Sequence, residues 1–327
     1  MIINTYLPDS IITNQDLQTE FPDWDAVSFE KKVGIKQRYI ADNNQTSLDL
    51  GIEAAKKTLK SFDKSKIDFV LFCTQSPDYF LPTSACILQD KLGLNKSCGA
   101  LDFNLGCSGY VYGLSIVKGL LSANIASNIL FVVAETYTKY IHPKDRTNRS
   151  IFGDGAAATI ITKNDLNKIG EFVLKTDGGG YDKLILKNGA CRTPFIHEAE
   201  EKTYGEDNKY TDNHLYMDGP DIFTFTIENI PILIDETLKK NRTSIDGIDF
   251  VIFHQANAFM LNFLRKSIKI PKDKFYINLE ETGNTVSATI PIAIKNALDE
   301  KLIKLGNKVL LAGFGVGLSW GATIITI

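Results

Sequence analysis

Two stretches of this chain, Ile67-Asp-Phe-Val-Leu-Phe-Cys-Thr-Gln-Ser76 and Ile248-Asp-Phe-Val-Ile-Phe-His-Gln-Ala-Asn257, are almost the same and lie 181 positions apart. Two further pairs of similar stretches follow in the same order: residues 128–134 with 307–313, and residues 155–162 with 321–326. Chance similarity between apolar segments would not keep both order and spacing. The sequence therefore predicts that the chain contains two copies of one structural unit.

The matched stretches are short, continuous and rich in Val, Ile and Phe, which is typical of strands buried on both faces of a sheet. Segments with helical periodicity lie between them, at residues 47–62, 109–122 and 289–302. Alternating strands and helices predict α/β units with mostly parallel sheets. We divide the chain into an N-terminal half, residues 1–168, and a C-terminal half, residues 169–327.

One segment interrupts this pattern. From about residue 176 to residue 220 the chain is polar and rich in glycine, beginning with Asp177-Gly-Gly-Gly180. A stretch of this length between regular elements predicts a long excursion of the chain, and we interpret it as a lid over a site.

The composition excludes several classes of protein. The 327 residues suggest about two domains at roughly 150 residues each, and an apolar content of 44% excludes a disordered or collagen-like chain. The chain has 36 Lys and Arg against 39 Asp and Glu, which gives a net charge of −3. A dedicated nucleic-acid-binding protein is expected to be strongly basic, so this class is not favoured. Residues 1–17 do not resemble a secretory signal, and no apolar run approaches the length of a membrane span.

The cysteines point to a reducing environment. There are five, Cys73, Cys86, Cys98, Cys107 and Cys191, with no Cys-x-x-Cys pair among them. We therefore expect neither a disulfide framework nor a metal site. Free thiols of this kind favour a cytoplasmic location.

Cys107 is the first candidate for chemistry. It follows an apolar run and opens the apolar helix predicted at residues 109–122. Unpaired backbone N–H groups and the positive end of the helix dipole both favour a thiolate at such a position, which would be a nucleophile. The alternative is a small buried core residue.

The C-terminal half supplies two more candidates. His254 ends a predicted strand in the place that Cys73 occupies in the first half. Asn284 lies three residues before Ser287, which the duplication pairs with Cys107. A pseudo-twofold axis between the halves would bring these loops together. The alternatives are a strand-end histidine with satisfied hydrogen bonds and an asparagine in a turn or cap.

Two glycine-rich segments are interpreted structurally. Residues 312–321 look like a dinucleotide-binding loop, but an apolar strand follows them instead of a helix. Closely spaced glycines there would let the backbone approach a reacting centre and present N–H donors to it. Phe152-Gly-Asp-Gly155 reads as a tight turn, in which Asp154 has a structural role.

Together these segments resemble one family, the 3-oxoacyl-acyl-carrier-protein synthase III enzymes of the thiolase superfamily. The motifs that carry the resemblance occur in order along nearly the whole chain: residues 6–8, 13–14, 33–35, 80–86, 106–109, 152–158, 254–257, 282–285 and 317–321. The resemblance implies a five-layered α/β/α/β/α sandwich built from two duplicated halves, usually as a homodimer. It also implies that Cys107, His254 and Asn284 form the family's catalytic triad.

The resemblance implies a decarboxylative Claisen condensation. Cys107 would take an acyl group from an acyl thioester on coenzyme A or on acyl carrier protein, and malonyl-acyl carrier protein would then lose CO2. His254 and Asn284 would donate hydrogen bonds to the resulting enolate, and the backbone N–H groups of Cys107 and Val316 would form a second oxyanion hole. No cofactor beyond these carriers, no nucleic acid and no membrane is implied.

The chain departs from the family's usual pattern at five positions. Ser28 and Lys32 stand where a tryptophan and an arginine usually grip the adenine of coenzyme A, and Leu81 replaces a phenylalanine that often limits primer length. Phe259 stands where an arginine often helps to dock the carrier, and Val316 replaces the middle glycine of the last loop. These differences predict a different acyl donor, carrier-bound or longer. They also favour specialised lipid or polyketide biosynthesis over central fatty acid biosynthesis.

Two groups of residues are further candidates for binding. We expect Leu81, Phe223 and Phe225 to line the substrate pocket. Carrier proteins are acidic, so the basic residues Arg265, Lys266 and Lys269 are candidates for docking them. The alternative for this basic run is a solvated helix face.

Two other functions stay open at this point. The same cysteine could pass its acyl group to an alcohol or amine acceptor, which would leave malonyl-acyl carrier protein unconsumed. The chain could also be a silent partner subunit or scaffold. Retention of all three triad residues argues against the scaffold.

Overall fold

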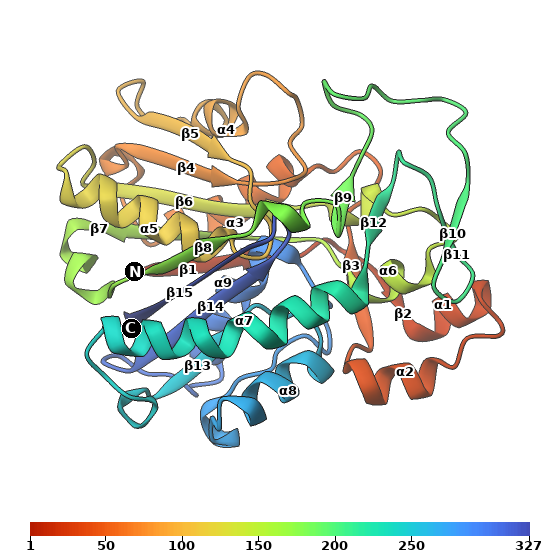
Figure 1. Cartoon of the computed structure of the whole chain (residues 1–327). Helices are drawn as coiled ribbons and strands as arrows, with labels where there is room; N and C mark the ends of the chain where they lie inside the picture. Colours follow the sequence, from red (N-terminus) through yellow and green to blue (C-terminus); the bar gives the residue numbers. More distant parts are fainter.

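The computed structural model describes residues 1–327 and contains two large sheets with the same order of strands (Figure 1). The first has the order β1 (Ile2–Tyr6), β7 (Gly155–Thr162), β6 (Asn128–Glu135), β4 (Phe69–Cys73) and β5 (Gly99–Phe103). The second has the order β8 (Val173–Thr176), β15 (Ser319–Thr326), β14 (Lys308–Gly315) and β13 (Phe250–Phe253). A parallel bridge between Val251 and Phe275 takes the place of a fifth strand. The predicted duplication is therefore present in the strand topology.

The prediction of mostly parallel sheets is wrong. Only β4 with β5, β4 with β6, and β13 with β14 run parallel, whereas the four other pairs of these sheets are antiparallel. Parallel neighbours need a crossover of a dozen or more residues, usually a helix packed on the sheet. β14 instead turns into β15 over residues 316–318, and β6 returns as β7 through the short helices η2 (Tyr137–Tyr140) and α6 (Arg146–Ile151).

Helices form three layers around these sheets, so the fold has five layers. α3 (Ser47–Leu59) and α4 (Ser84–Leu92) cover the outer face of the first sheet, and α7 (Gly219–Lys240) and α8 (Ala258–Ser267) cover that of the second. α5 (Gly109–Ser122) and α9 (Thr289–Asp299) lie between the sheets and share with both a cluster of 27 buried residues. This is the predicted five-layered sandwich.

The three predicted helices are confirmed. α5 has the predicted bounds, while α3 and α9 start at the predicted residue and end three residues early. Thr46 caps α3 in a capping box with Asp49, so two backbone donors at its start are satisfied. In contrast, no side chain caps α5, whose first backbone N–H groups follow Cys107 directly.

The remaining elements flank the sandwich. β2 (Ser10–Thr13) pairs with β3 (Gln37–Ile40), and α1 (Asn14–Glu20) and α2 (Ala26–Val33) lie between them in sequence. The predicted excursion forms small hairpin-like pairs of its own, β9 (Leu184–Leu186) with β12 (Leu215–Met217) and β10 (Lys202–Tyr204) with β11 (Asn208–Tyr210) (Figure 1). None of the helices combines the length and apolar character needed to cross a membrane.

Candidate active site

Cys107 lies between β5 and α5, with only 5% of its surface exposed. The backbone of β14 runs against it. A Cβ atom on Gly313 would lie 2.7 Å from the Cys107 carbonyl oxygen, and one on Gly315 would lie 3.0 Å from its Sγ. Real Cβ atoms rarely approach so closely, so glycine at these positions lets the last loop reach the thiol, as the sequence predicts.

Val286 is the residue around which the three candidate groups meet. It belongs to η7 (Val286–Ala288) and packs in one buried cluster with Cys107. Its backbone N–H donates to Oδ1 of Asn284 at 2.9 Å. Its carbonyl oxygen accepts the Thr289 hydroxyl at 3.0 Å, and that hydroxyl lies 2.8 Å from Nδ1 of His254. The structure therefore brings together Cys107 from one half with His254 and Asn284 from the other.

The backbone of Val286 is strained. Its φ is +54°, in the left-handed region that β-branched residues rarely adopt. Such a conformation costs about 1–3 kcal/mol and persists only where the surrounding structure imposes it. Here the surroundings are the hydrogen bond to Asn284 and the packing against Cys107, so the strain lies in the loop that presents the Asn284 side chain.

His254 is a neutral imidazole. Burial lowers the pKa of His254 to about 3, because desolvation disfavours the charged ring. Thr289 carries one hydroxyl hydrogen and can donate it to Val286 O or to Nδ1 of His254. When Nδ1 accepts it, the ring proton resides on Nε2. No hydrogen bond within the chain occupies Nε2, which leaves it available to a substrate.

Asn284 is held by the first half of the chain. Its backbone N–H donates to Ile151 O at 2.9 Å, and its carbonyl accepts the Gly153 N–H at 3.0 Å. Its side-chain oxygen is taken by Val286, and its side-chain NH2 has no partner within the chain. Asn284 therefore presents an unused NH2 donor, and His254 an unused Nε2, in the surroundings of the Cys107 thiol.

The resting thiol is protonated. Burial, reinforced by the nearby carboxyl of Glu135, raises the pKa of Cys107 to about 12. Desolvation therefore opposes the thiolate that the start of the helix favours at Cys107. The backbone N–H groups of Cys107 and Val316 act in the opposite direction by donating toward the sulfur. These are the two donors that the sequence analysis assigns to an oxyanion hole.

Comparison with known proteins agrees with this arrangement. The model of the family 3-oxoacyl-[acyl-carrier-protein] synthase III matches residues 101–178, and that of its C-terminal part matches residues 238–327. The beta-ketoacyl-[acyl-carrier-protein] synthase III of Clostridium perfringens is 36% identical over 325 residues, covering 98% of this chain and 97% of that protein. The chain belongs to the 3-oxoacyl-[acyl-carrier-protein] synthase III family.

Solved structures of synthase III proteins show the same fold. A 2.1 Å crystal structure of a 3-oxoacyl-(acyl-carrier-protein) synthase III has a TM-score of 0.97 and 43% identity, covering 99% of this chain and 98% of that one. The synthase of Burkholderia xenovorans has a TM-score of 0.90 and 33% identity, covering 100% and 93% of the two chains.

The apolar wall beside Cys107 differs from the predicted one. Leu81 is 82% exposed and does not line the site within its own chain. Phe225 packs against Trp320 in the core beneath α7, and Phe223 stacks on Phe259, with ring centroids 5.1 and 5.6 Å apart respectively. The reason is that successive residues of α7 point in different directions, and the neighbouring Ile222 is the one that packs against the Cys107 cluster.

The residues that form this wall come from segments without a periodic pattern. Tyr137 and Ile141 lie in the connection from β6 to β7, and Leu184 and Leu215 lie in the excursion. Phe152 and Val286 complete the buried set. The only sequence signal for Leu184 and Leu215 is their apolar character within a polar segment, and the excursion thus covers the site through these two side chains.

The candidate docking residues lie at the far end of α8. His254 precedes the start of this helix, whereas Arg265 and Lys266 are in its last turn and Lys269 follows it. Ten residues of helix span about 15 Å, so the basic group is a helix length from the site. Lys266 and Lys269 are exposed, but Arg265 donates to Ile270 O of its own chain at 3.3 Å.

Two positions that depart from the synthase III pattern contact each other. The ammonium of Lys32 lies 5.6 Å from the centre of the Phe259 ring. Phe259 is 47% exposed and belongs to an aromatic group with Phe223 and Phe263. Phe259 and its aromatic neighbours therefore form an aromatic surface with the Lys32 ammonium above it.

Asp154 has the structural surroundings that the sequence suggests. Its buried carboxyl accepts from the backbone N–H of Ala41 at 2.8 Å and from that of Thr138 at 3.1 Å. Burial raises the pKa of Asp154 to about 6, despite these bonds. It ties the turn after α6 to two neighbouring segments.

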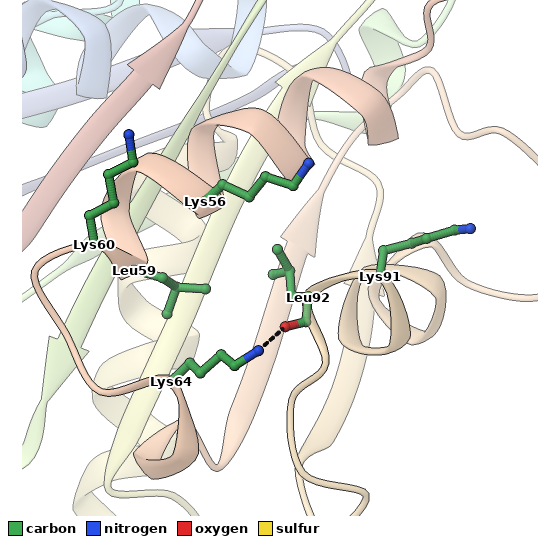
Figure 2. A pocket seen from close by; sticks show the side chains of 6 residues that line it. All are labelled: Lys56, Leu59, Lys60, Lys64, Lys91 and Leu92. Atoms are coloured by element: carbon green, nitrogen blue, oxygen red, sulfur yellow. Dashed lines mark hydrogen bonds between the residues drawn. The ribbon is translucent and has the colours of Figure 1, made fainter.

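A separate cavity lies between α3 and α4, on the outer layer of the first half (Figure 2). Its walls are formed by Lys56, Leu59, Lys60, Lys64, Lys91 and Leu92. Lys64 donates to the Leu92 carbonyl at 3.0 Å, while Lys60 and Lys91 point away from each other (Figure 2). None of the triad residues lines this cavity, so it is not part of the site.

Proposed function

We propose that this chain is a condensing enzyme that joins an acyl thioester to malonyl-acyl carrier protein, with loss of CO2, to give a 3-oxoacyl-acyl carrier protein in fatty acid biosynthesis. One observation carries the proposal: a buried thiol faces two backbone donors, while Asn284 offers an unused NH2 and His254 an unused Nε2 beside it. The relatives named beta-ketoacyl-[acyl-carrier-protein] synthase III support the same reaction.

The first half-reaction is acyl transfer to Cys107, in a ping-pong sequence. The sulfur forms a bond to the acyl carbon, the donor's C–S bond breaks, and the thiol proton leaves with the donor thiol of coenzyme A or of a carrier protein. The backbone N–H groups of Cys107 and Val316 stabilise the intermediate oxyanion. Each such donor contributes roughly 3 kcal/mol to the transition state.

The second half-reaction is decarboxylation and condensation. Malonyl-acyl carrier protein loses CO2, and its C–C bonding electrons become an enolate. Nε2–H of neutral His254 and the NH2 of Asn284 donate to the enolate oxygen, after which the carbon attacks the acyl group on Cys107 and the thiolate leaves. All steps use these three side chains and the substrates, so the proposal includes no resident cofactor.

The proposed assembly is a homodimer. β5 is an edge strand of the first sheet, and unpaired edges favour pairing with another chain. Leu101 on β5 is 44% exposed, and Phe80 and Leu81 in the nearby loop before α4 are 81% and 82% exposed. Two copies that pair through β5 would cover this apolar surface. The free cysteines favour a cytoplasmic location for the assembly.

Intact mass spectrometry tests the function. The chain is offered a panel of acyl-CoAs and acyl-carrier proteins, and we expect an acyl adduct that is absent from Cys107→Ala. Malonyl-acyl carrier protein should then release CO2 and yield the 3-oxoacyl product. An unlabelled Cys107 with every donor would refute the proposal. Acyl transfer to an alcohol or amine would show itself by leaving the malonyl carrier unconsumed.

A further inference from the structure

Glu135, the last residue of β6, is fully buried and unused by the reaction described above. Its carboxyl nevertheless lies where the two halves of the site meet. Its two oxygens are hydrogen-bonded to four different residues, one of which belongs to the other half of the chain.

The bond across the halves reaches the loop of the catalytic amide. Ser287 donates its hydroxyl to Oε1 of Glu135 at 2.8 Å. Ser287 lies in η7, between Asn284 and Thr289. The Thr289 hydroxyl is the hydrogen-bonding partner of His254. Through Ser287 the carboxyl therefore fixes the loop that positions both enolate donors.

The bonds within the first half reach the loop of the nucleophile. Oε2 of Glu135 accepts the Gln75 backbone N–H at 3.0 Å and the Ser76 hydroxyl at 3.1 Å. The Gln75 side chain donates to Asn104 Oδ1 at 3.0 Å, and its Oε1 lies 2.5 Å from where a Cβ on Gly106 would be. Gln75 thus braces the segment that leads directly into Cys107.

The carboxyl has no cation to compensate it. Its hydrogen-bond partners are a backbone amide and hydroxyls. The titratable groups around it are Asp154 together with Cys73, Cys107, Tyr137 and Tyr140, all of which are neutral or acidic. Burial raises the pKa of Glu135 to about 8, so the carboxyl is mainly protonated at neutral pH.

We propose that Glu135 is a positioning residue whose buried carboxyl clamps the loops of Cys107 and Asn284 onto each other. Its ionisation places a negative charge near Cys107 and disfavours the thiolate. This inference adds a residue to the proposed condensing site. Only its test by kcat rests on the proposed function, because the effect of Glu135 on the Cys107 thiol is measurable without any substrate.

The kinetic test compares two variants of Glu135. Glutamine has nearly the shape and hydrogen-bonding capacity of a protonated carboxyl, so Glu135→Gln should keep kcat within about threefold of wild type at pH 7. Glu135→Ala removes the clamp and should lower kcat about 100-fold, with KM changed far less, since a misplacement of about 1 Å can cost that much. A normal kcat in Glu135→Ala, or equal losses in both variants, would overturn the positioning role.

The second test measures alkylation of Cys107 by iodoacetamide against pH, with the labelled residue identified by mass. At pH 9.5 the wild-type Glu135 is ionised, so Glu135→Gln should be alkylated faster, by about threefold or more. The matched control is Asp68→Asn. Asp68 accepts the Ser127 and Asn128 N–H groups at the opposite end of the β4–β6 pair, at 2.8 and 2.9 Å.

The alkylation test can fail independently of the test of the proposed condensation. Asp68→Asn should leave the alkylation profile of Cys107 unchanged, because the carboxyl that it replaces lies away from the thiol. Equal profiles for wild type and Glu135→Gln would refute the coupling to Cys107. If the wild-type chain failed to condense its substrates, the alkylation profiles would still report on Glu135.

Discussion

Asn284 accepts the Val286 N–H through its side-chain oxygen at 2.9 Å, so its NH2 group is the end that faces the site. Asn284→Asp keeps an acceptor for Val286 but replaces the donor with a negatively charged oxygen. We expect CO2 release from malonyl-acyl carrier protein to fall by about two to three orders of magnitude. Acyl transfer to Cys107, measured by intact mass, should stay close to wild type. Equal losses in both half-reactions would contradict this division of roles.

Thr289 should determine the tautomer of His254. Thr289→Val removes the hydroxyl 2.8 Å from Nδ1, so the Nε2–H tautomer loses its support. We expect decarboxylation to slow about tenfold, a typical loss when a ligand-orienting partner is removed. Thr237→Val is a matched control, because this buried hydroxyl bonds Leu233 O within α7, away from the site. Slowing by the control to the same extent would mean that lost stability, rather than the tautomer, explains the effect.

The neutrality of His254 should appear in the pH dependence of stability. Its pKa is about 3 in the folded chain and near 6.5 when unfolded, so the unfolded state binds the extra proton between these values. The contribution of His254 is fully present above pH 6.5 and is lost as the pH falls toward 3, by up to about 1.4 kcal/mol per pH unit. Urea unfolding of His254→Gln should show a shallower fall between pH 6.5 and 4.5 than wild type. Parallel curves would show that the ring is not buried in its neutral form.

Gly315 should be intolerant of a side chain because of Cys107. A Cβ atom there would lie 3.0 Å from the sulfur, and the φ of +156° already disfavours alanine. We expect Gly315→Ala to slow acylation of Cys107 at least 100-fold through displacement of the thiol. Gly306→Ala distinguishes the contact with the sulfur from the backbone strain. Gly306 also has a positive φ, of +91°, but nothing lies within 4 Å of its added Cβ. Acylation should be normal in that control and is followed by the mass of the acyl-enzyme.

Much of the fold could be predicted because duplication leaves a record in the sequence. The apolar periodicity of residues 109–122 gave the bounds of α5, and the repeated strands predicted two copies of one unit, which the matching strand order of the two sheets confirms. Strand direction was mispredicted, since a buried strand has the same apolar composition in parallel and antiparallel pairs. Only the length of the connections, such as the three residues between β14 and β15, distinguishes the two cases.

The site, like the fold, has a part that the sequence predicts and a part that it does not. Cys107, His254 and Asn284 could be named as candidates because each stands in a motif at the end of a strand or just before a helix. The wall residues Leu184 and Leu215 could not, because their contacts depend on how an irregular segment folds back. Glu135 was missed for another reason: at the end of an apolar strand, nothing in its neighbours reveals that hydroxyls from both halves converge on it.

The middle layer of the sandwich makes the two repeats dependent on each other. Its 27-residue cluster takes side chains from both repeats, so either repeat alone would expose a sheet of apolar residues and half of a reaction centre to water. Neither repeat can therefore keep its inner face dry without the other. A cut of the chain between them would leave two fragments that have to reassociate before either the middle layer or the reaction centre exists.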